Sequence, residues 1–238
     1  MTDIALNESL GYAYAQARER LHNALADAGR AQDAAELLAV SKTKPAAMIR
    51  QAWQLGQRQF GENYLQEALE KQAELADLDD IVWHFIGPLQ SNKTRAVAEH
   101  FDWMHSVDRL KIAKRLSEQR PTHLAPLNIC LQVNISREES KAGVLPEELE
   151  ELAREVAMLP NLYLRGLMAI PAPAKSLDAQ RQPLAALREA FIALQKSLPD
   201  APLDTLSMGM SDDLEAAVLE GATLVRLGTA IFGARQSA

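Results

Sequence analysis

Residues 37–45 read Leu37-Leu38-Ala39-Val40-Ser41-Lys42-Thr43-Lys44-Pro45, an apolar run that ends in small polar residues, two lysines and a proline. Consecutive apolar residues of this length are typical of a buried strand. Pro45 suits the first turn of a helix, because its fixed φ is already helical and its missing N–H would have no partner there. The stretch therefore predicts a strand that leads directly into a helix.

The same unit recurs along the chain on both sides of this stretch. Apolar residues at helical spacing fill the intervals between the apolar runs, and a further helix is expected over 6–28. Strands that alternate with helices favour parallel pairing, and continuous apolar strands indicate that both faces of the sheet are covered. The expected strands are 37–41, 59–62, 82–86, 103–107, 129–133, 162–169, 205–208 and 224–232.

About eight such units and the extra helix favour a single (β/α)8 TIM barrel, which we expect to occupy residues 1–238 as one domain. An open doubly wound sheet is the alternative. No linker or low-complexity segment interrupts the alternation.

Composition excludes several classes of partner. The formal net charge of -7 disfavours a nucleic-acid partner, because an acidic surface repels phosphates. No apolar run approaches the roughly 20 residues that a membrane span needs, and no secretory signal opens the sequence. The one cysteine, Cys130, lies in an apolar run and reads as a buried strand residue. We expect a cytoplasmic protein with no membrane partner.

In a barrel of this class, the active site lies at the carboxyl ends of the strands. Lys42 continues the alternation of Leu38 and Val40, so its amine is expected to point into the barrel mouth. A neutral amine there can attack an aldehyde. The alternative is a solvated lysine at a strand end, and Lys44 is the nearest rival, although it has already left the strand.

A phosphate site is predicted between the last two loops, where barrels of this class often bind phosphate. Ser207, Gly209 and Ser211 follow the seventh strand, and Gly228 and Thr229 follow the eighth. Small residues there present backbone N–H groups to an anion.

The same turn also reads as an ordinary helix cap. Ser211 or Asp212 would be the N-cap, and Glu215 follows Asp212 at capping-box spacing. Asp212 and Asp213 would repel an anion, so they are expected to point along the helix or outward.

Arg226 interrupts the last apolar strand. A buried guanidinium needs a partner, because it keeps its charge at ordinary pH. That partner is either a structural carboxylate such as Glu62 or the aromatic nitrogen of a ligand. His84 is expected to point to the same face of its strand as Val82 and Ile86. It is either a hydrogen-bonded core histidine or a ring near a ligand.

Other residues are weaker candidates for the mouth, namely Asn63, Asn134 and Met168. Metal and nucleotide motifs are absent from the sequence: there is no HExxH, CxxC or Walker loop.

Long blocks of the sequence resemble one known family. They are Leu38–Pro45, Phe60–Tyr64, Trp83–Lys93, Arg165–Met168, Leu206–Asp213 and Val225–Gly233. These blocks are similar to those of the YggS-like pyridoxal phosphate homeostasis proteins, and the match runs to about Arg235.

The resemblance implies a barrel like the N-terminal domain of alanine racemase, with pyridoxal 5'-phosphate (PLP) bound as an internal aldimine on Lys42. It also implies that Arg226 faces the pyridine nitrogen. Ser207, Ser211, Gly228 and Thr229 would hold the phosphate. The full set of expected cofactor-binding residues is Lys42, Asn63, His84, Met168, Ser207, Met210, Ser211, Arg226, Gly228 and Thr229.

The family implies a carrier or regulator of vitamin B6 and amino-acid balance that is not an enzyme, with PLP-dependent apoenzymes as recipients. The alternative is a weak PLP-dependent amino-acid racemase. Racemisation needs two bases, and the racemases take the second, a tyrosine, from a second domain that we expect this chain to lack. Without that domain we expect a monomer. A third reading, a cofactor-free Schiff-base aldolase acting on a sugar phosphate, predicts a colourless protein.

Overall fold

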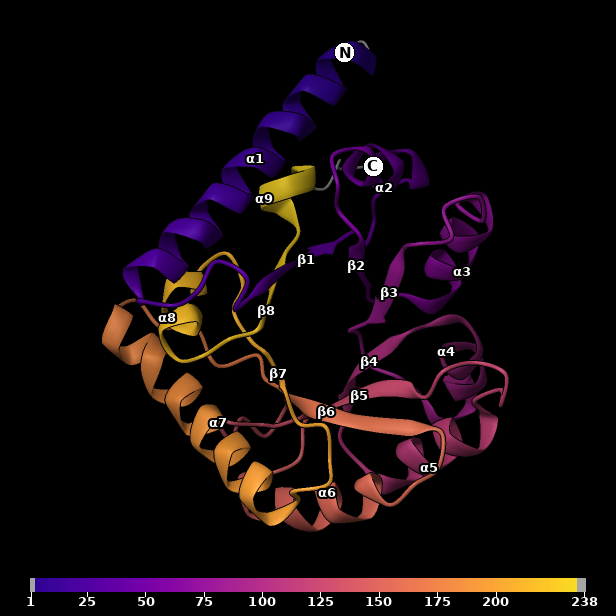
Figure 1. The fold of residues 1–238 in the computed structure, drawn as a ribbon, viewed down its shortest axis with the longest axis vertical. Helices are drawn as coiled ribbons and strands as arrows, with labels where there is room; N and C mark the ends of the chain where they lie inside the picture. The colour runs from indigo at the N-terminus through magenta and orange to yellow at the C-terminus, as the bar shows by residue number, and fades with distance from the viewer. Residues whose placement is uncertain (1–2, 235–238) are drawn as a thin grey trace.

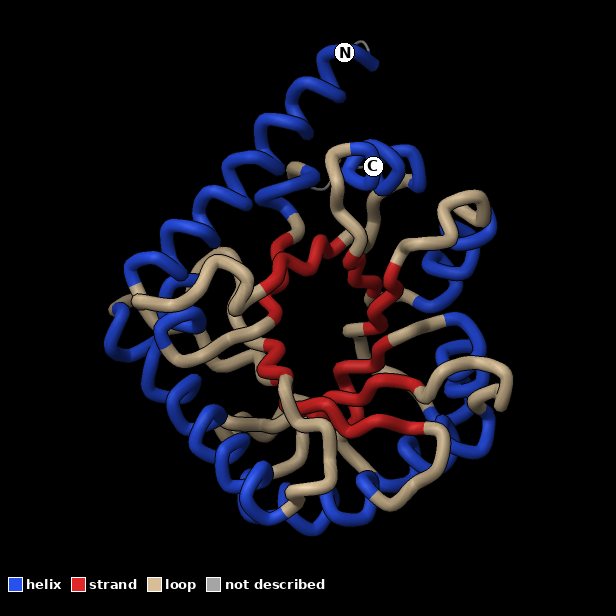
Figure 2. The backbone as a smooth tube through the Cα atoms, in the orientation of Figure 1, coloured by secondary structure: helices blue, strands red, loops and turns tan. Residues whose placement is uncertain are grey.

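The computed structural model describes residues 3–234, and its strands close into a barrel. Each strand pairs in parallel with its neighbours in sequence order, and pairing of β1 with β8 closes the ring (Figure 1, Figure 2). The (β/α)8 fold class is therefore confirmed. The strands are β1 (Glu36–Val40), β2 (Gln59–Glu62), β3 (Val82–Phe85), β4 (Trp103–Val107), β5 (Leu127–Gln132), β6 (Leu162–Met168), β7 (Thr205–Ser207) and β8 (Leu224–Leu227).

Helices surround the ring of strands (Figure 2). Helix α6, for example, presents an apolar face to β6, with buried Leu149, Leu152 and Val156. The helices are α1 (Asp3–Asp27), α2 (Ala46–Gln54), α3 (Leu65–Glu74), α4 (Thr94–His100), α5 (Leu110–Gln119), α6 (Leu149–Ala157), α7 (Leu177–Ser197), α8 (Leu214–Leu219) and α9 (Thr229–Phe232), with 3-10 turns η1 (Ser91–Lys93) and η2 (Pro146–Glu148).

The additional N-terminal helix predicted from the sequence is present as α1. It runs along the outside of the barrel past α8 and α9, and its N-terminal half extends beyond the other elements (Figure 1). Arg20 forms a bidentate ion pair with Glu215 of α8, in which both N–O distances are 2.8 Å. Arg30 donates to the carbonyl oxygens of Val218 and Ala222 and so binds the end of α8. Helix α1 and the turn that follows it thus hold α8 in place.

The interior of the barrel is partly polar. His84, His105, Ser207 and Arg226 are all buried. The His105 ring is hydrogen-bonded to the Ser207 hydroxyl, which joins β4 to β7 across the interior because these strands are not neighbours. Between the sheet and the helices the core is apolar, with Phe60 among its fully buried residues. The polar interior lies directly below the barrel mouth.

Gly166 allows β6 and β7 to approach closely. A Cβ at this position would lie 1.6 Å from the carbonyl oxygen of Thr205, so no other residue fits without a shift of the strand.

Two local predictions were wrong. The apolar run 224–232 is not one strand: β8 ends at Leu227 and α9 begins at Thr229. A short apolar run does not distinguish a strand from a buried helix, and here the Phe232 N–H donates to the Gly228 carbonyl oxygen at 2.9 Å, which is a helical hydrogen bond. The N-cap of α8 is Asp213 rather than Ser211 or Asp212.

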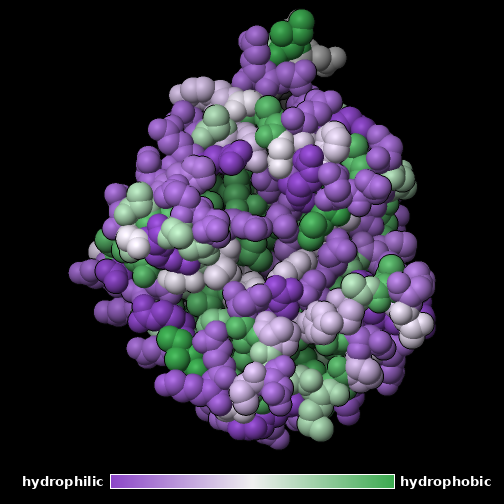
Figure 3. Space-filling view, in the orientation of Figure 1, coloured by the Kyte–Doolittle hydropathy of each residue, from purple (hydrophilic) through white to green (hydrophobic). Residues whose placement is uncertain are grey.

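No helix within residues 3–234 has the length and apolar character needed to cross a membrane. The same residues contain no cluster of three or more His, Cys, Asp or Glu side chains suited to a metal ion. The face seen in Figure 3 is mostly polar, with apolar side chains in small separate groups.

Candidate functional site

A cavity of about 350 Å³ opens at the carboxyl ends of β1, β2, β6 and β8. Its size falls in the range of small-molecule sites, and it lies where a barrel of this class has its active site. The residues that line it are Val40, Lys42, Asn63, Ile86, Met168, Ile170, Met210, Ser211, Asp212, Arg226, Gly228 and Thr229.

Lys42 lies two residues beyond the last residue of β1 and lines this cavity. Its side chain is half-buried, and it forms no ion pair with a carboxylate of residues 3–234. Lys44 points elsewhere, because its amine donates to the carbonyl oxygen of Ala234 at 2.8 Å. Of these two lysines, Lys42 is the one whose amine can react with a ligand in the cavity.

A buried ionic cluster holds the residues on either side of Lys42. The Lys71 amine donates to the carbonyl oxygen of Ser41 and pairs with Glu62 and Glu67, each at 2.7 Å. The Ser41 hydroxyl donates to Glu62, and the Thr43 N–H donates to Glu67 at 2.6 Å. Thr43 has a φ of 66°, which is unfavourable for a branched residue and is held here by that bond. The cluster thus fixes the backbone on both sides of Lys42.

Arg226 is a buried cation whose partners are neutral oxygens. Only 4% of the residue is exposed, and burial lowers its pKa to about 10. It donates to the Ser207 carbonyl and hydroxyl oxygens at 2.8 and 2.7 Å, and to the Ala169 carbonyl oxygen at 3.0 Å. The expected alternative partner, Glu62, pairs with Lys71 instead. Arg226 therefore forms no ion pair with a carboxylate of residues 3–234, although the charge of Asp213 favours its protonated form.

The loop after β7 and the start of α9 form a further wall of the cavity. Ser211, Gly228 and Thr229 line it, and the carbonyl oxygen of Ser211 accepts a bond from Arg20 of α1 at 2.6 Å. The side chain of Asp213 accepts the Met210 N–H at 2.7 Å, which fixes the turn. This wall offers small residues and two hydroxyls, those of Ser211 and Thr229, to an anionic group.

The acids of this loop differ in position. Asp213 is engaged by the Met210 N–H, whereas Asp212, expected to point outward, is exposed and borders the cavity. The Asp212 carboxylate therefore lies on the same cavity as Ser211, Gly228 and Thr229.

Replacement of Gly209 with alanine is expected to destabilise the protein by about 1–3 kcal/mol. Gly209 has a φ of 102°, and its Cβ would lie 2.6 Å from the Cβ of Ala217. Chemical denaturation measures the effect. Gly56→Ala is the matched control, because Gly56 has a similar φ of 105° with open space around it. Equal losses of stability in Gly209→Ala and Gly56→Ala would show that the close contact with Ala217 contributes nothing to the effect.

Asn63 contributes an unsatisfied acceptor. Its Oδ1 is buried without a hydrogen-bond partner among residues 3–234, and the residue lines the cavity. A buried unpaired acceptor is costly, so a donor from a ligand would stabilise this arrangement.

The structure brings together eight of the ten residues expected to bind a cofactor. The other two, His84 and Ser207, lie below the cavity and do not line it. His84 is hydrogen-bonded to Gln59 and His105, which matches the reading of a satisfied core histidine. Asn134, also considered for the mouth, binds the backbone of Glu138 instead.

Sequence reasoning missed part of the site. Ile86 and Ile170 line the cavity but are indistinguishable from ordinary strand-end residues. Lys71 could have been found, since it shares the buried face of α3 with Ala68 at a spacing of three residues. A lysine on such a face indicates a buried charge that needs a carboxylate.

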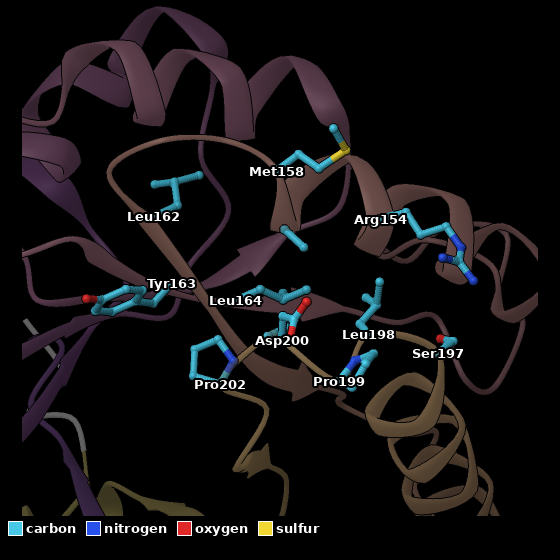
Figure 4. A pocket seen from close by; sticks show the side chains of 12 residues that line it. Arg154, Met158, Leu162, Tyr163, Leu164, Ser197, Leu198, Pro199, Asp200 and Pro202 are labelled. Atoms are coloured by element: carbon cyan, nitrogen blue, oxygen red, sulfur yellow. The ribbon is translucent and has the colours of Figure 1, made fainter.

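A second hollow, of about 550 Å³, lies at the other end of the barrel (Figure 4). It is bounded by the end of α6, the start of β6 and the segment after α7, with Met158, Tyr163 and Pro202 among its lining residues. Its charged side chains are Arg154 and Asp200, and no lysine or histidine lines it. This hollow is larger than the Lys42 cavity but has no amine for Schiff-base chemistry.

Comparison with known proteins supports the same assignment of the fold. Residues 18–236 match the family model described as alanine racemase, N-terminal domain. The chain is 63% identical over 221 residues to the pyridoxal phosphate homeostasis protein of Pseudomonas aeruginosa, covering 93% of this chain and 94% of the relative. It is 54% identical over 237 residues to the protein of that name in Escherichia coli K12, covering 99% and 98%.

The structure is also similar to that of PipY from Synechococcus elongatus with PLP bound. The TM-score is 0.79 and the identity 42%, over 90% of this chain and all of PipY.

Proposed function

We infer the function from one premise: the chain belongs to the family of pyridoxal phosphate homeostasis proteins, whose barrel is of the alanine racemase N-terminal type. On that premise the protein binds PLP and takes part in vitamin B6 homeostasis. The observation that carries the proposal is the position of the Lys42 amine in the same cavity as Arg226. PLP has an aldehyde, an aromatic nitrogen and a phosphate, and the cavity offers a group for each.

The residues present fit PLP at three points. Lys42 supplies the amine for the aldehyde, and Arg226 supplies N–H donors for the pyridine nitrogen, as arginine does in some PLP proteins. Ser211, Gly228 and Thr229 form the wall where the phosphate would bind. The unpaired Asn63 Oδ1 marks a place where a ligand donor is missing.

We propose that the protein carries or buffers PLP and hands it to PLP-dependent apoenzymes, without turnover of its own. Arg226 disfavours protonation of the pyridine nitrogen, because two positive charges would then face each other. In PLP enzymes the pyridine ring of bound PLP accepts electrons from the substrate. A pyridine ring whose nitrogen is unprotonated accepts electrons less well. The weak racemase remains the alternative, but no tyrosine or histidine lines the cavity to act as a second base.

The tyrosines of the chain do not supply that base. Tyr64 is the N-cap of α3 and is 47% exposed, and Tyr14 is buried in a hydrogen bond to Gln57 outside the cavity. Tyr12 and Tyr163 are exposed elsewhere on the surface. We also propose that the chain works as one domain, as a cytoplasmic monomer. Its single buried thiol, Cys130, is consistent with a reducing compartment.

The purified protein is expected to turn yellow with PLP and to show no steady conversion of L-alanine or L-serine to the D-isomer. Absorption spectroscopy and a coupled D-amino-acid assay measure the two properties. Steady turnover that disappears in Lys42→Ala would refute the carrier proposal and favour the racemase. A protein that stays colourless with PLP would refute PLP binding and favour the cofactor-free aldolase.

A further inference from the structure

A chain of hydrogen bonds crosses the barrel interior below the cavity. Arg226 Nη1 donates to Ser207 Oγ at 2.7 Å, and Ser207 Oγ lies 2.8 Å from His105 Nδ1. His105 Nε2 lies 2.8 Å from His84 Nδ1, and His84 Nε2 lies 2.5 Å from Gln59 Oε1. Of these five residues only Arg226 lines the Lys42 cavity.

The direction of every bond in this hydrogen-bond chain follows from its glutamine end. The Gln59 side-chain oxygen Oε1 only accepts, so a neutral His84 carries its proton on Nε2 and has a free lone pair on Nδ1. His84 Nδ1 then accepts from the Nε2–H of His105, which leaves His105 Nδ1 to accept the Ser207 hydroxyl hydrogen. Ser207 Oγ in turn accepts from Arg226, whose guanidinium has donors and no acceptor. All the dipoles point away from the charge of Arg226.

Both histidines are neutral in this position. Each is fully buried, and desolvation lowers the pKa of His84 to about 3. The pKa of His105 is lowered well below its ordinary value by burial, and further by His84 and by the charge of Arg226. His84 also stacks on Trp103, with ring centroids 5.3 Å apart. Each ring is thus held in one tautomer and one orientation.

The chain determines which N–H groups Arg226 offers to a ligand. Both hydrogens of Nη1 go to Ser207 and one hydrogen of Nη2 goes to the Ala169 carbonyl oxygen. Because a guanidinium has five N–H groups, Nε–H and one Nη2–H are left. A Ser207 hydroxyl that turned its hydrogen towards Arg226 would place two donors face to face, and His105 prevents this by accepting that hydrogen.

We propose that His105 and His84, neither of which touches the cavity, are positioning residues for Arg226. They hold the Ser207 hydroxyl as an acceptor, which fixes the guanidinium with two free N–H groups aimed at the pyridine nitrogen of PLP. The inference rests on the proposed function, since it takes PLP as the ligand. Gln59, at the far end of the hydrogen-bond chain, orients the His84 ring.

The first test uses the unmodified protein without PLP. Two-dimensional ¹H–¹⁵N NMR of histidine-labelled protein at neutral pH reports the tautomer of each ring. We expect His84 and His105 to be neutral, each with its proton on Nε2. A proton on Nδ1 of either ring, a mixture of tautomers or a charged ring would overturn the inference, whatever the protein binds.

The second test compares two substitutions at His105. His105→Leu removes the acceptor for Ser207, and we expect it to weaken PLP binding about tenfold. It should also move the ¹⁵N chemical shift of the pyridine nitrogen in labelled PLP, a readout that a merely structural role leaves unchanged. His105→Asn should restore much of the PLP affinity and of the pyridine ¹⁵N chemical shift, because the Asn Oδ1 can accept the Ser207 hydrogen where His105 Nδ1 does.

The matched control is Ile129→Val, a small change at a fully buried position in β5 that takes no part in the hydrogen-bond chain. It should leave both the affinity and the nitrogen shift unchanged. If His105→Leu folds and binds PLP with the affinity and nitrogen shift of the unmodified protein, the positioning role is wrong while the proposed function stands. If the unmodified protein fails to bind PLP, the proposed function fails. The measured tautomers of His84 and His105 would still show whether the hydrogen-bond chain from Arg226 to Gln59 is present.

Discussion

Replacement of Lys42 with alanine is expected to abolish covalent attachment of PLP completely. In the unmodified protein the Lys42 nitrogen attacks the aldehyde carbon, so a C=N bond replaces the C=O bond and water leaves. Borohydride then adds hydride to that carbon and converts the imine into a stable secondary amine. Mass spectrometry should show one phosphopyridoxyl group on the peptide that contains Lys42, and none in Lys42→Ala.

Lys44→Ala is the matched control for this experiment. Lys44 is two residues away, but its amine is bound to the Ala234 carbonyl oxygen and it does not line the cavity. The control should keep the full mass addition. Loss of the addition in Lys44→Ala with retention in Lys42→Ala would show that the wrong lysine has been assigned.

Replacement of Lys71 with methionine is expected to destabilise the protein by about 3–5 kcal/mol at neutral pH, because it leaves a buried carboxylate without its cation. The side chains of Lys71 and Glu62 are 6% and 0% exposed, and their charged atoms are 2.7 Å apart. The change also removes the donor to the Ser41 carbonyl oxygen, so the backbone next to Lys42 should loosen. Chemical denaturation measures the loss of stability.

The loss of stability in Lys71→Met should grow as the pH rises. Burial raises the pKa of Glu62, and Lys71 is the largest influence that opposes this rise. A carboxyl group whose pKa is higher in the folded state binds more protons when folded than when unfolded. The orphaned Glu62 carboxyl of Lys71→Met therefore costs least stability below about pH 4.5, the pKa of this group in the unfolded protein. The variant loses stability as the pH rises from there through the raised pKa of Glu62 in the folded protein.

Two further variants test this explanation. Glu62→Gln added to Lys71→Met removes the orphaned charge and should recover part of the lost stability and most of its pH dependence. Lys141→Met is the control, because Lys141 and its partner Glu138 are largely exposed and such pairs contribute little. A Lys71→Met loss that is no larger than the control, or that is independent of pH, would contradict a buried ion pair.

The order and type of the elements followed from local sequence. Apolar runs bounded by polar turns gave strands close to their observed bounds, as at 59–62 and 103–107. The run 224–232 was predicted wrongly because residues 224–227 and residues 229–232 are both mostly apolar. The second part forms a short helix that packs against α1.

Candidate residues followed from their position at strand ends. Lys42 and Arg226 could be placed at the mouth because parallel strands bring their carboxyl ends to one edge. Their partners could not be assigned in the same way. Glu62 was considered for Arg226, but it is bound by Lys71, a residue on the following helix.

The barrel, its N-terminal helix and the lysine and arginine at its mouth could be predicted from the sequence, because they depend on periodicity and on the ends of elements. Which polar groups meet inside could not, as the contact of His105 with Ser207 across 102 residues shows. Burial makes each polar group require a partner, but it does not specify which one. Closure of the barrel makes that choice, since it brings β4 and β7 face to face across the interior.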